Sequence, residues 1–240
     1  MSTLNLISLP IDVRAFRLWA AHRNLSFDEG AALHHLLGES FGKSVLQPFR
    51  LMVAPGAVNA TLYAYTQTDK ASLVQAGEET GMPDALSVCD PSRIAVKSMP
   101  QTWANGRQLA FDLRVRPVRR LINSVGGIRK GAEIDAFLAE ALRRHPEGPS
   151  PDDKIDRDAV YRNWLSARLG AAAEVTQVRI ACFERTIALR NGKKCEGPDV
   201  TFHGELTIRD GDEFADRLAK GIGRHAAYGY GMLLLRPSRK

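Results

Sequence analysis

The chain has 240 residues, of which 44% are hydrophobic, and this composition suits one or two packed domains. Its net charge of +6 and its pI near 9.4 favour an anionic partner. No apolar run approaches the roughly 18 residues of a transmembrane helix, and residues 1–10 lack a signal-peptide pattern. The three scattered cysteines form neither a disulfide framework nor a CxxC zinc pair. We therefore expect a cytoplasmic protein.

The first half of the chain alternates strands and helices. A helix is predicted after residue 26 from the helical spacing of Leu33, Leu36 and Leu37, and Asp28 suits its N-terminal cap. Strands are predicted at 4–9, 49–53, 61–65 and 93–97, and further helices at 13–21 and 69–80. The order strand, helix, strand, strand, helix, strand is the split βαβ pattern of a ferredoxin-like domain.

The same order starts again in the second half. Residues 109–116 alternate with period two, so that Phe111 and Leu113 face one way and Arg114 and Arg116 the other. Helices are predicted at 134–144, 157–169 and 212–220, strands at 175–189, 200–208 and 232–235, and a turn at 191–192 or near 197–198. We therefore predict an α+β fold of two tandem ferredoxin-like (RRM-like) domains, residues 1–103 and 107–240.

Positive charge is concentrated at the start of the second half. Residues 107–130 contain one acid, Asp112, and seven basic residues: Arg107, Arg114, Arg116, Arg119, Arg120, Arg129 and Lys130. Such an excess either serves an anionic ligand or forms a solvated face. Because the aromatic pattern that stacks bases on RNA-binding sheets is absent, any contact with RNA is expected through charge, shape and loops.

A glycine-rich stretch at 221–231 precedes the last predicted strand. It contains Gly221, Gly223, Arg224, His225, Gly229 and Gly231. Such a loop can aim backbone N–H groups at phosphate oxygens, or it can be a simple turn between a helix and a strand. The loose match to a dinucleotide fingerprint is excluded, because a helix precedes the glycines and the chain ends too soon for the required acid.

Several segments match one known family, in the family's order. They are FDLRVRPVRR (111–120), GIRKGAEIDAFL (127–138), NWLSARLG (163–170), VTFHGELTIRD (200–210) and GIGRHAAYGYGMLLLRP (221–237), with a weaker match at ALHHLLGESFG (32–42). Together they resemble the CasE family, the repeat-processing endoribonucleases of type I-E CRISPR systems.

The resemblance implies a metal-independent endoribonuclease that cuts CRISPR precursor RNA at repeat stem-loops. Attack by a ribose 2′-OH would leave a 2′,3′-cyclic phosphate and a 5′-OH, and no cofactor or metal is expected. The implied partners are the repeat RNA hairpin, the mature crRNA and other Cascade subunits, with no membrane.

The family's catalytic histidine falls on His34, on the first-half helix, and His35 is the alternative. Histidine suits proton transfer because its ordinary pKa lies near physiological pH. The positions expected to bind RNA are Arg114, Arg116, Arg119, Arg120, Arg129, Lys130, Gly221, Gly223, Arg224, His225, Gly229 and Gly231.

Two positions depart from the family pattern. Ala31 stands where some relatives carry a tyrosine, and Ala226 stands where many carry a lysine. Three interpretations therefore remain open: an active endoribonuclease, a repeat-RNA-binding subunit that has lost cleavage, and a ferredoxin-like protein with another anionic ligand.

Overall fold

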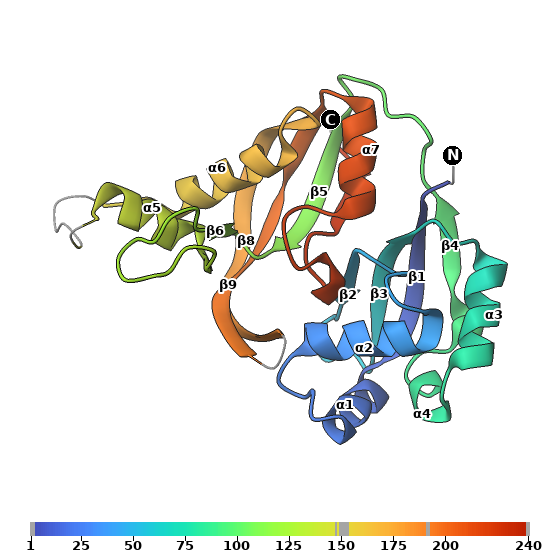
Figure 1. The fold of residues 1–240 in the computed structure, drawn as a ribbon. Coiled ribbons are helices and arrows are strands. Elements are labelled where there is room, and N and C mark those ends of the chain that lie inside the picture. The colour runs from blue at the N-terminus through green and yellow to red at the C-terminus, as the bar shows by residue number, and fades with distance from the viewer. Residues whose placement is uncertain (1–2, 147, 149–153, 191–192, 239–240) are drawn as a thin grey trace.

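A computed structural model of the chain describes residues 3–146, 148, 154–190 and 193–238. It contains two four-stranded antiparallel sheets, each covered by helices on one face (Figure 1). We call the part from β1 to β4 the N-terminal unit and the part from β5 to β10 the C-terminal unit. Among the described residues, no helix is both long and apolar enough to cross a membrane.

The N-terminal unit has the ferredoxin-like strand order β2-β3-β1-β4. Its elements are β1 (Asn5–Asp12), α1 (Val13–His22), α2 (Glu29–Phe41), β2 (Phe49–Met52), β3 (Asn59–Thr66), α3 (Lys70–Thr80), α4 (Pro83–Leu86), the short 3₁₀ turn η1 (Pro91–Arg93) and β4 (Ala95–Ser98). Alternation along β1 buries Ile7, Leu9 and Ile11 beneath the helices, while the residues between them remain partly exposed.

The C-terminal unit has the order β10-β5-β9-β8, which is the same arrangement read from the opposite edge of the sheet. Its elements are β5 (Gln108–Val115), β6 (Val118–Arg120), β7 (Glu133–Asp135), α5 (Ala136–Arg144), α6 (Arg157–Leu169), β8 (Ala173–Arg190), β9 (Lys193–Ile208), α7 (Gly211–Lys220), the 3₁₀ turn η2 (Ala226–Tyr228) and β10 (Leu233–Pro237). The predicted fold class of two tandem ferredoxin-like units is thus confirmed. The boundary predicted within 101–106 falls between β4 and β5, and the division into separate domains stays a prediction.

Aspartates fix where the helices begin. In the described part of the chain, each of the six helices of nine or more residues is preceded by an aspartate that accepts a hydrogen bond from a backbone N–H of the first turn. Asp28 does this for α2, at 2.9 Å from the N–H of Ala31. The cap therefore fixes the register of the helix that carries the two candidate catalytic histidines.

Two predicted boundaries in the C-terminal unit are wrong. The helix predicted from residue 134 begins at Ala136, because Glu133–Asp135 pair with Val118–Arg120 as a small second sheet and Asp135 caps α5. The strand predicted from residue 200 begins at Lys193, so Gly197 and Pro198 lie inside β9, paired with Thr186 and Arg185. A turn near 197–198 is therefore excluded, and the alternative at 191–192 lies outside the described residues.

The two units share buried contacts. Tyr65 of β3 is buried in the hydrophobic cluster of the C-terminal unit, and its hydroxyl donates to the carbonyl oxygen of Leu233 at 2.9 Å. Arg50 of β2 reaches Asp112 of β5 at 3.7 Å. Burial lowers the pKa of Arg50, although the charge of Asp112 opposes this effect. The placement of one unit against the other thus rests on packing and on specific polar contacts.

The hydroxyl of Tyr65 offers a direct test of this junction. We expect Tyr65→Phe to lower the free energy of unfolding by about 1 kcal/mol, because a buried hydrogen bond is lost. Tyr63→Phe, on the same strand but only half-buried, is the matched control and should change stability by less than about 0.5 kcal/mol. Urea unfolding of the two variants measures both values, and equal stability would show that the bond to Leu233 does not hold the units together.

Candidate functional site

Helix α2 and the glycine-rich loop 221–231 meet where the two units join (Figure 1). At Gly30 the approach is so close that an added Cβ would lie 2.4 Å from the carbonyl oxygen of Tyr228. One turn further along α2, the half-buried ring of His34 packs on the ring of Tyr228, with the centroids 4.9 Å apart. The histidine predicted from the N-terminal half therefore touches the loop predicted from the C-terminal half.

His35 lies beside His34 but faces elsewhere. Its side chain is exposed, and its ring centre is 5.6 Å from that of His34 in an edge-on arrangement. Among the ring contacts of the described residues, Tyr228 pairs with His34 and His225 and not with His35. The geometry therefore favours His34 over His35 as the residue of the shared site, although its catalytic role stays a prediction.

The four glycines of the loop have a clear structural reason. All four have φ between +79° and +84°, a region that other residues rarely adopt. An added Cβ would lie 2.9 Å from the ring of Trp164 at Gly223, and 2.6 Å from the carbonyl oxygen of Ile222 at Gly231. The N–H of Gly231 already donates to the carbonyl oxygen of Arg114 at 2.7 Å. Contact of Gly221, Gly223, Gly229 and Gly231 with RNA stays a prediction.

Arg224 and His225 of the loop both contact Glu133 of β7. The Nε of Arg224 lies 2.5 Å from one carboxylate oxygen, and the Nε2 of His225 lies 2.7 Å from the other. Burial raises the pKa of Glu133, but the hydrogen bond from His225 and the charges of His225, Arg224 and Arg116 outweigh it, so the pKa is lowered. Glu133 is thus held as an anion that joins the loop to the small β6–β7 sheet.

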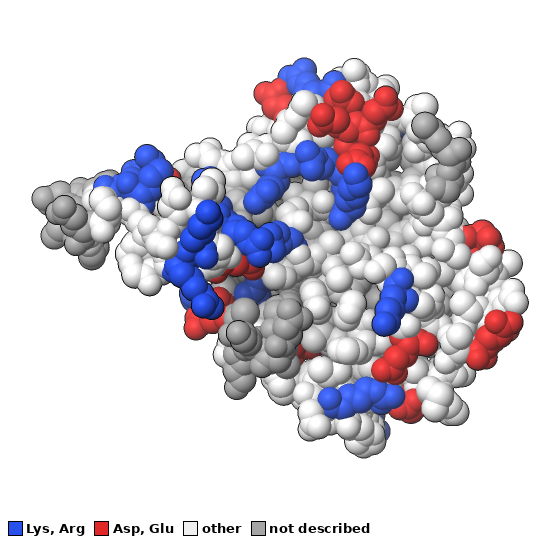
Figure 2. Space-filling model, in the orientation of Figure 1, with Lys and Arg blue, Asp and Glu red and all other residues white. Residues whose placement is uncertain are grey.

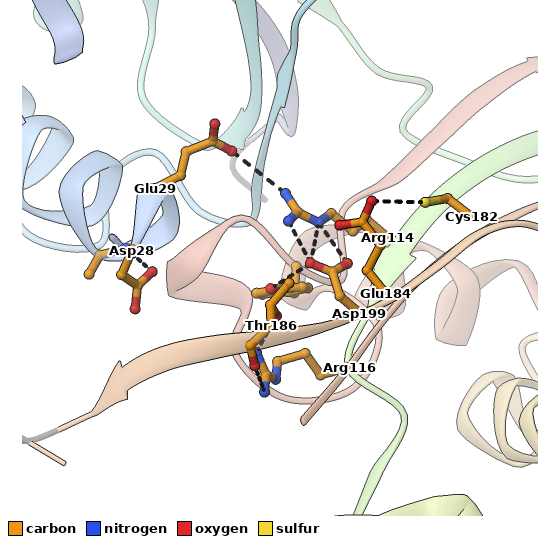
Figure 3. A network of polar contacts seen from close by, with 10 residues as sticks. Asp28, Glu29, Arg114, Arg116, Cys182, Glu184, Thr186 and Asp199 are labelled. Atoms are coloured by element: carbon orange, nitrogen blue, oxygen red, sulfur yellow. Dashed lines mark hydrogen bonds and ion pairs between the residues drawn. The ribbon is translucent and has the colours of Figure 1, made fainter. Parts of the chain in front are cut away.

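Arg114 is the centre of a polar network at the junction (Figure 3). Its guanidinium binds both oxygens of Asp199, with contacts of 2.6 to 3.2 Å, and reaches Glu29 of α2 at 3.7 Å. Tyr230 donates its hydroxyl to Asp199 at 3.0 Å. Burial alone would lower the pKa of Arg114, but the hydrogen bonds and charge of Asp199 raise it, so the guanidinium stays charged.

Arg116, the other arginine predicted on this strand face, is only 3% exposed. Its guanidinium donates to the hydroxyl oxygen of Thr186 at 3.0 Å and to the carbonyl oxygen of Thr186 at 3.4 Å. Arg114 and Arg116 are therefore engaged within the protein, and their contact with RNA stays a prediction.

The remaining basic residues lie at the surface. Arg119, Arg120, Arg129 and Lys130 are exposed on β6 and on the loop that leads to β7. Figure 2 shows Lys and Arg side chains gathered over this part of the C-terminal unit. We call these four residues the basic loop. The chain continues from Lys130 to Glu133, the first residue of β7, and Glu133 contacts Arg224 and His225 of the glycine-rich loop.

Sequence reasoning missed three members of this site. Tyr228 lies inside the recognised GIGRHAAYGYG motif but received no role of its own. Asp199 and Glu133 are single acids in strands: Asp199 lies just before the VTFHGELTIRD motif, and Glu133 lies inside GIRKGAEIDAFL but received no role of its own. Their importance comes from pairing with Arg114 across 85 positions and with His225 across 92 positions of the chain, which local patterns cannot indicate.

Comparison with known proteins identifies the family. The model of a family described as "CRISPR associated protein" matches residues 6–237, and the chain therefore belongs to this family, as its CasE-like motifs predict. The Cascade subunit CasE of Escherichia coli K12 is 26% identical over 132 residues, which are 55% of this chain and 59% of that protein. The match thus spans less than two thirds of that relative.

Solved structures share the whole fold. A CRISPR endoribonuclease Cse3 bound to a 19-nucleotide RNA has a TM-score of 0.67 and 19% identity, with 98% of this chain and 100% of that chain covered. Cas6e from Escherichia coli K-12 has a TM-score of 0.57 and 21% identity, with the same two coverages. At these identities the likeness establishes the fold.

The tight contact at Gly30 can be tested by substitution. We expect Gly30→Ala to destabilise the protein by about 1–3 kcal/mol, because its Cβ would overlap the backbone of Tyr228. Gly38→Ala in the same helix is the matched control: its Cβ meets nothing within 4 Å outside the helix backbone, and the higher helix propensity of alanine should stabilise by about 0.5–1 kcal/mol. Thermal unfolding distinguishes the two, and a stabilised Gly30→Ala would contradict the contact.

Proposed function

We propose that this protein is a metal-independent endoribonuclease that cleaves CRISPR precursor RNA at repeat stem-loops. It retains the mature crRNA and joins other Cascade subunits in the cytoplasm. Membership of the CRISPR-associated family supports this proposal, as do relatives that are named as a Cascade subunit and as an endoribonuclease bound to RNA. The observation that carries it is the contact of His34 with the glycine-rich loop, beside a surface of exposed cations.

In this proposal His34 acts as the base in the transesterification. It removes the proton from the ribose 2′-OH upstream of the cut, and the oxygen attacks the adjacent phosphorus. The P–O5′ bond breaks, which leaves a 2′,3′-cyclic phosphate and a 5′-OH. Half-burial of His34 keeps its ring in one place, while the remaining exposure lets substrate reach it.

The basic loop is the expected contact for the RNA stem. Four exposed cations on a short segment can bind several phosphates without reading base sequence. Arg224 and His225 extend this surface toward His34, because Glu133 joins them to the same β6–β7 sheet. A stem held on the basic loop would therefore have its end directed toward the site at α2.

A second candidate function is an RNA-binding subunit with weak or no cleavage. Ala31 and Ala226 favour it, because the CasE resemblance implies a tyrosine at the first position in some relatives and a lysine at the second in many. In this case the binding surface and the Cascade partners are the same, and only the chemical step is lost.

Cleavage of a repeat hairpin in EDTA tests the role of His34. We expect His34→Ala to lower the single-turnover rate by about 10²–10⁴-fold, because a general base is removed. His35→Ala, the matched control on the next residue, should leave the rate within a few-fold of the unsubstituted protein. A reversed pattern would move the role to His35, and tight binding by the unsubstituted protein without any cleavage would establish the second candidate function.

The salt dependence of binding tests the basic loop. We expect repeat-hairpin affinity to fall with salt, and Arg129→Ala with Lys130→Ala to reduce the slope of log K against log[salt] by about 2, because each phosphate contact contributes about 1. Arg14→Ala with Arg17→Ala makes the same charge change on exposed positions of α1 and is the control. An unchanged slope for the first pair would exclude the basic loop as the RNA contact.

A further inference from the structure

We propose that His225 is a second catalytic residue, the general acid that protonates the 5′ oxygen as it leaves. This inference rests on the proposed function and assigns the half of the reaction that His34 alone does not perform. It makes the site a two-histidine centre, with one imidazole from α2 and one from the glycine-rich loop.

The first support is the placement of the two rings. Tyr228 contacts both imidazoles, with ring centroids 4.9 Å from His34 and 6.5 Å from His225. The two imidazole rings are therefore at most about 11 Å apart. At such a separation a base and an acid can each come within hydrogen-bond reach of one phosphodiester. The side chain of His225 is 14% exposed, which orders the ring without closing it to substrate.

The second support is the backbone at His225. This residue has φ +69° and ψ +26°, the left-handed conformation. In the same loop the four positions with φ near +80° are all glycines. A non-glycine residue in this conformation costs about 1–2 kcal/mol. The chain thus keeps an imidazole at a position where glycine would fit more easily, and strain of this kind is concentrated at functional sites.

The third support is the set of groups that face His225. From β7, the carboxylate of Glu133 lies 2.7 Å from its Nε2 and places an anion beside the ring. From its own loop, Arg224 contacts the same carboxylate, and the ring centroids of Tyr228 and Tyr230 lie 6.5 Å from that of His225. These contacts hold the imidazole on the side of the loop where Tyr228 also contacts His34.

The proton transfers balance over the step. The 2′-OH gives its proton to neutral His34 as the new O2′–P bond forms. The P–O5′ bond breaks, its electron pair goes to the 5′ oxygen, and that oxygen takes a proton from the His225 imidazolium. The products are the 2′,3′-cyclic phosphate and the 5′-OH, and the two imidazoles then exchange protons with water.

A sulfur leaving group tests the assignment. The repeat hairpin is prepared with either an oxygen or a bridging 5′ sulfur at the cut, because a thiolate leaves without a proton. His225→Asn is the variant, since asparagine tolerates the left-handed conformation. We expect it to cleave the oxygen substrate about 10²–10⁴-fold more slowly and the sulfur substrate within a few-fold of the unsubstituted protein. His34→Ala should be slow on both substrates. His22→Asn, at an exposed position of α1, is the control and should cleave both substrates at the rate of the unsubstituted protein.

The outcomes separate this inference from the proposed function. If the unsubstituted protein cuts the oxygen substrate and His225→Asn cuts it equally fast, or is equally impaired on both substrates, His225 is not the acid. If the unsubstituted protein cuts neither substrate, the nuclease proposal itself fails and this inference fails with it. Hairpin affinity, measured alongside, shows that each variant is folded.

Discussion

The close packing of the glycine-rich loop on α2 is the constraint on which the rest of this structure depends. Gly30 has no Cβ, and the carbonyl of Tyr228 occupies the space that a Cβ would take. This contact brings the ring of Tyr228 onto His34, while Arg224 and His225, earlier in the same loop, contact Glu133 of β7. A site made from residues 34 and 225 exists only because two backbones can approach here.

Arg114 fixes the same junction electrostatically. Its carbonyl oxygen accepts the N–H of Gly231, and its guanidinium binds Asp199 and reaches Glu29 at the start of α2. Removing one partner of such a buried pair typically costs about 3–5 kcal/mol, whereas the intact pair adds little net stability. Arg114 therefore contributes by placement: through its backbone and its side chain, one residue of β5 contacts β9, the glycine-rich loop and α2.

Much of the fold follows from local sequence. Period-two alternation predicts β5, helical spacing with a cap at Asp28 predicts α2, and the order of the predicted elements indicates two ferredoxin-like units. The start of β9 was missed because Gly197-Pro198 is typical of a turn. Proline is accepted there because β5 pairs with β9 only from Val200 onward, so residues 193–199 pair on one side alone, with β8. Figure 1 shows this two-stranded ribbon extending beyond the sheet toward the N-terminal unit.

The candidate site also contains residues that the sequence predicts and residues that it does not. His34 and the glycine-rich loop could be predicted because motifs mark them, whereas the acids that set their environment could not. Arg116 shows the limit most clearly: its place on a strand face predicts an exposed cation, but the long β8–β9 ribbon brings Thr186 to it and buries it. Charge along a sequence does not indicate which cations the fold will cover.

The central claim is that one phosphodiester is bound by both units at once, between α2 and the glycine-rich loop. A crystal structure of the protein with a repeat hairpin carrying a single 2′-deoxy substitution upstream of the cut tests this most directly, because the nucleophile is absent and the RNA stays intact. The account predicts the scissile phosphate beside Tyr228, with the imidazoles of His34 and His225 within about 4 Å of its 2′ and 5′ sides. A scissile phosphate bound on one unit alone, remote from His34, would contradict it.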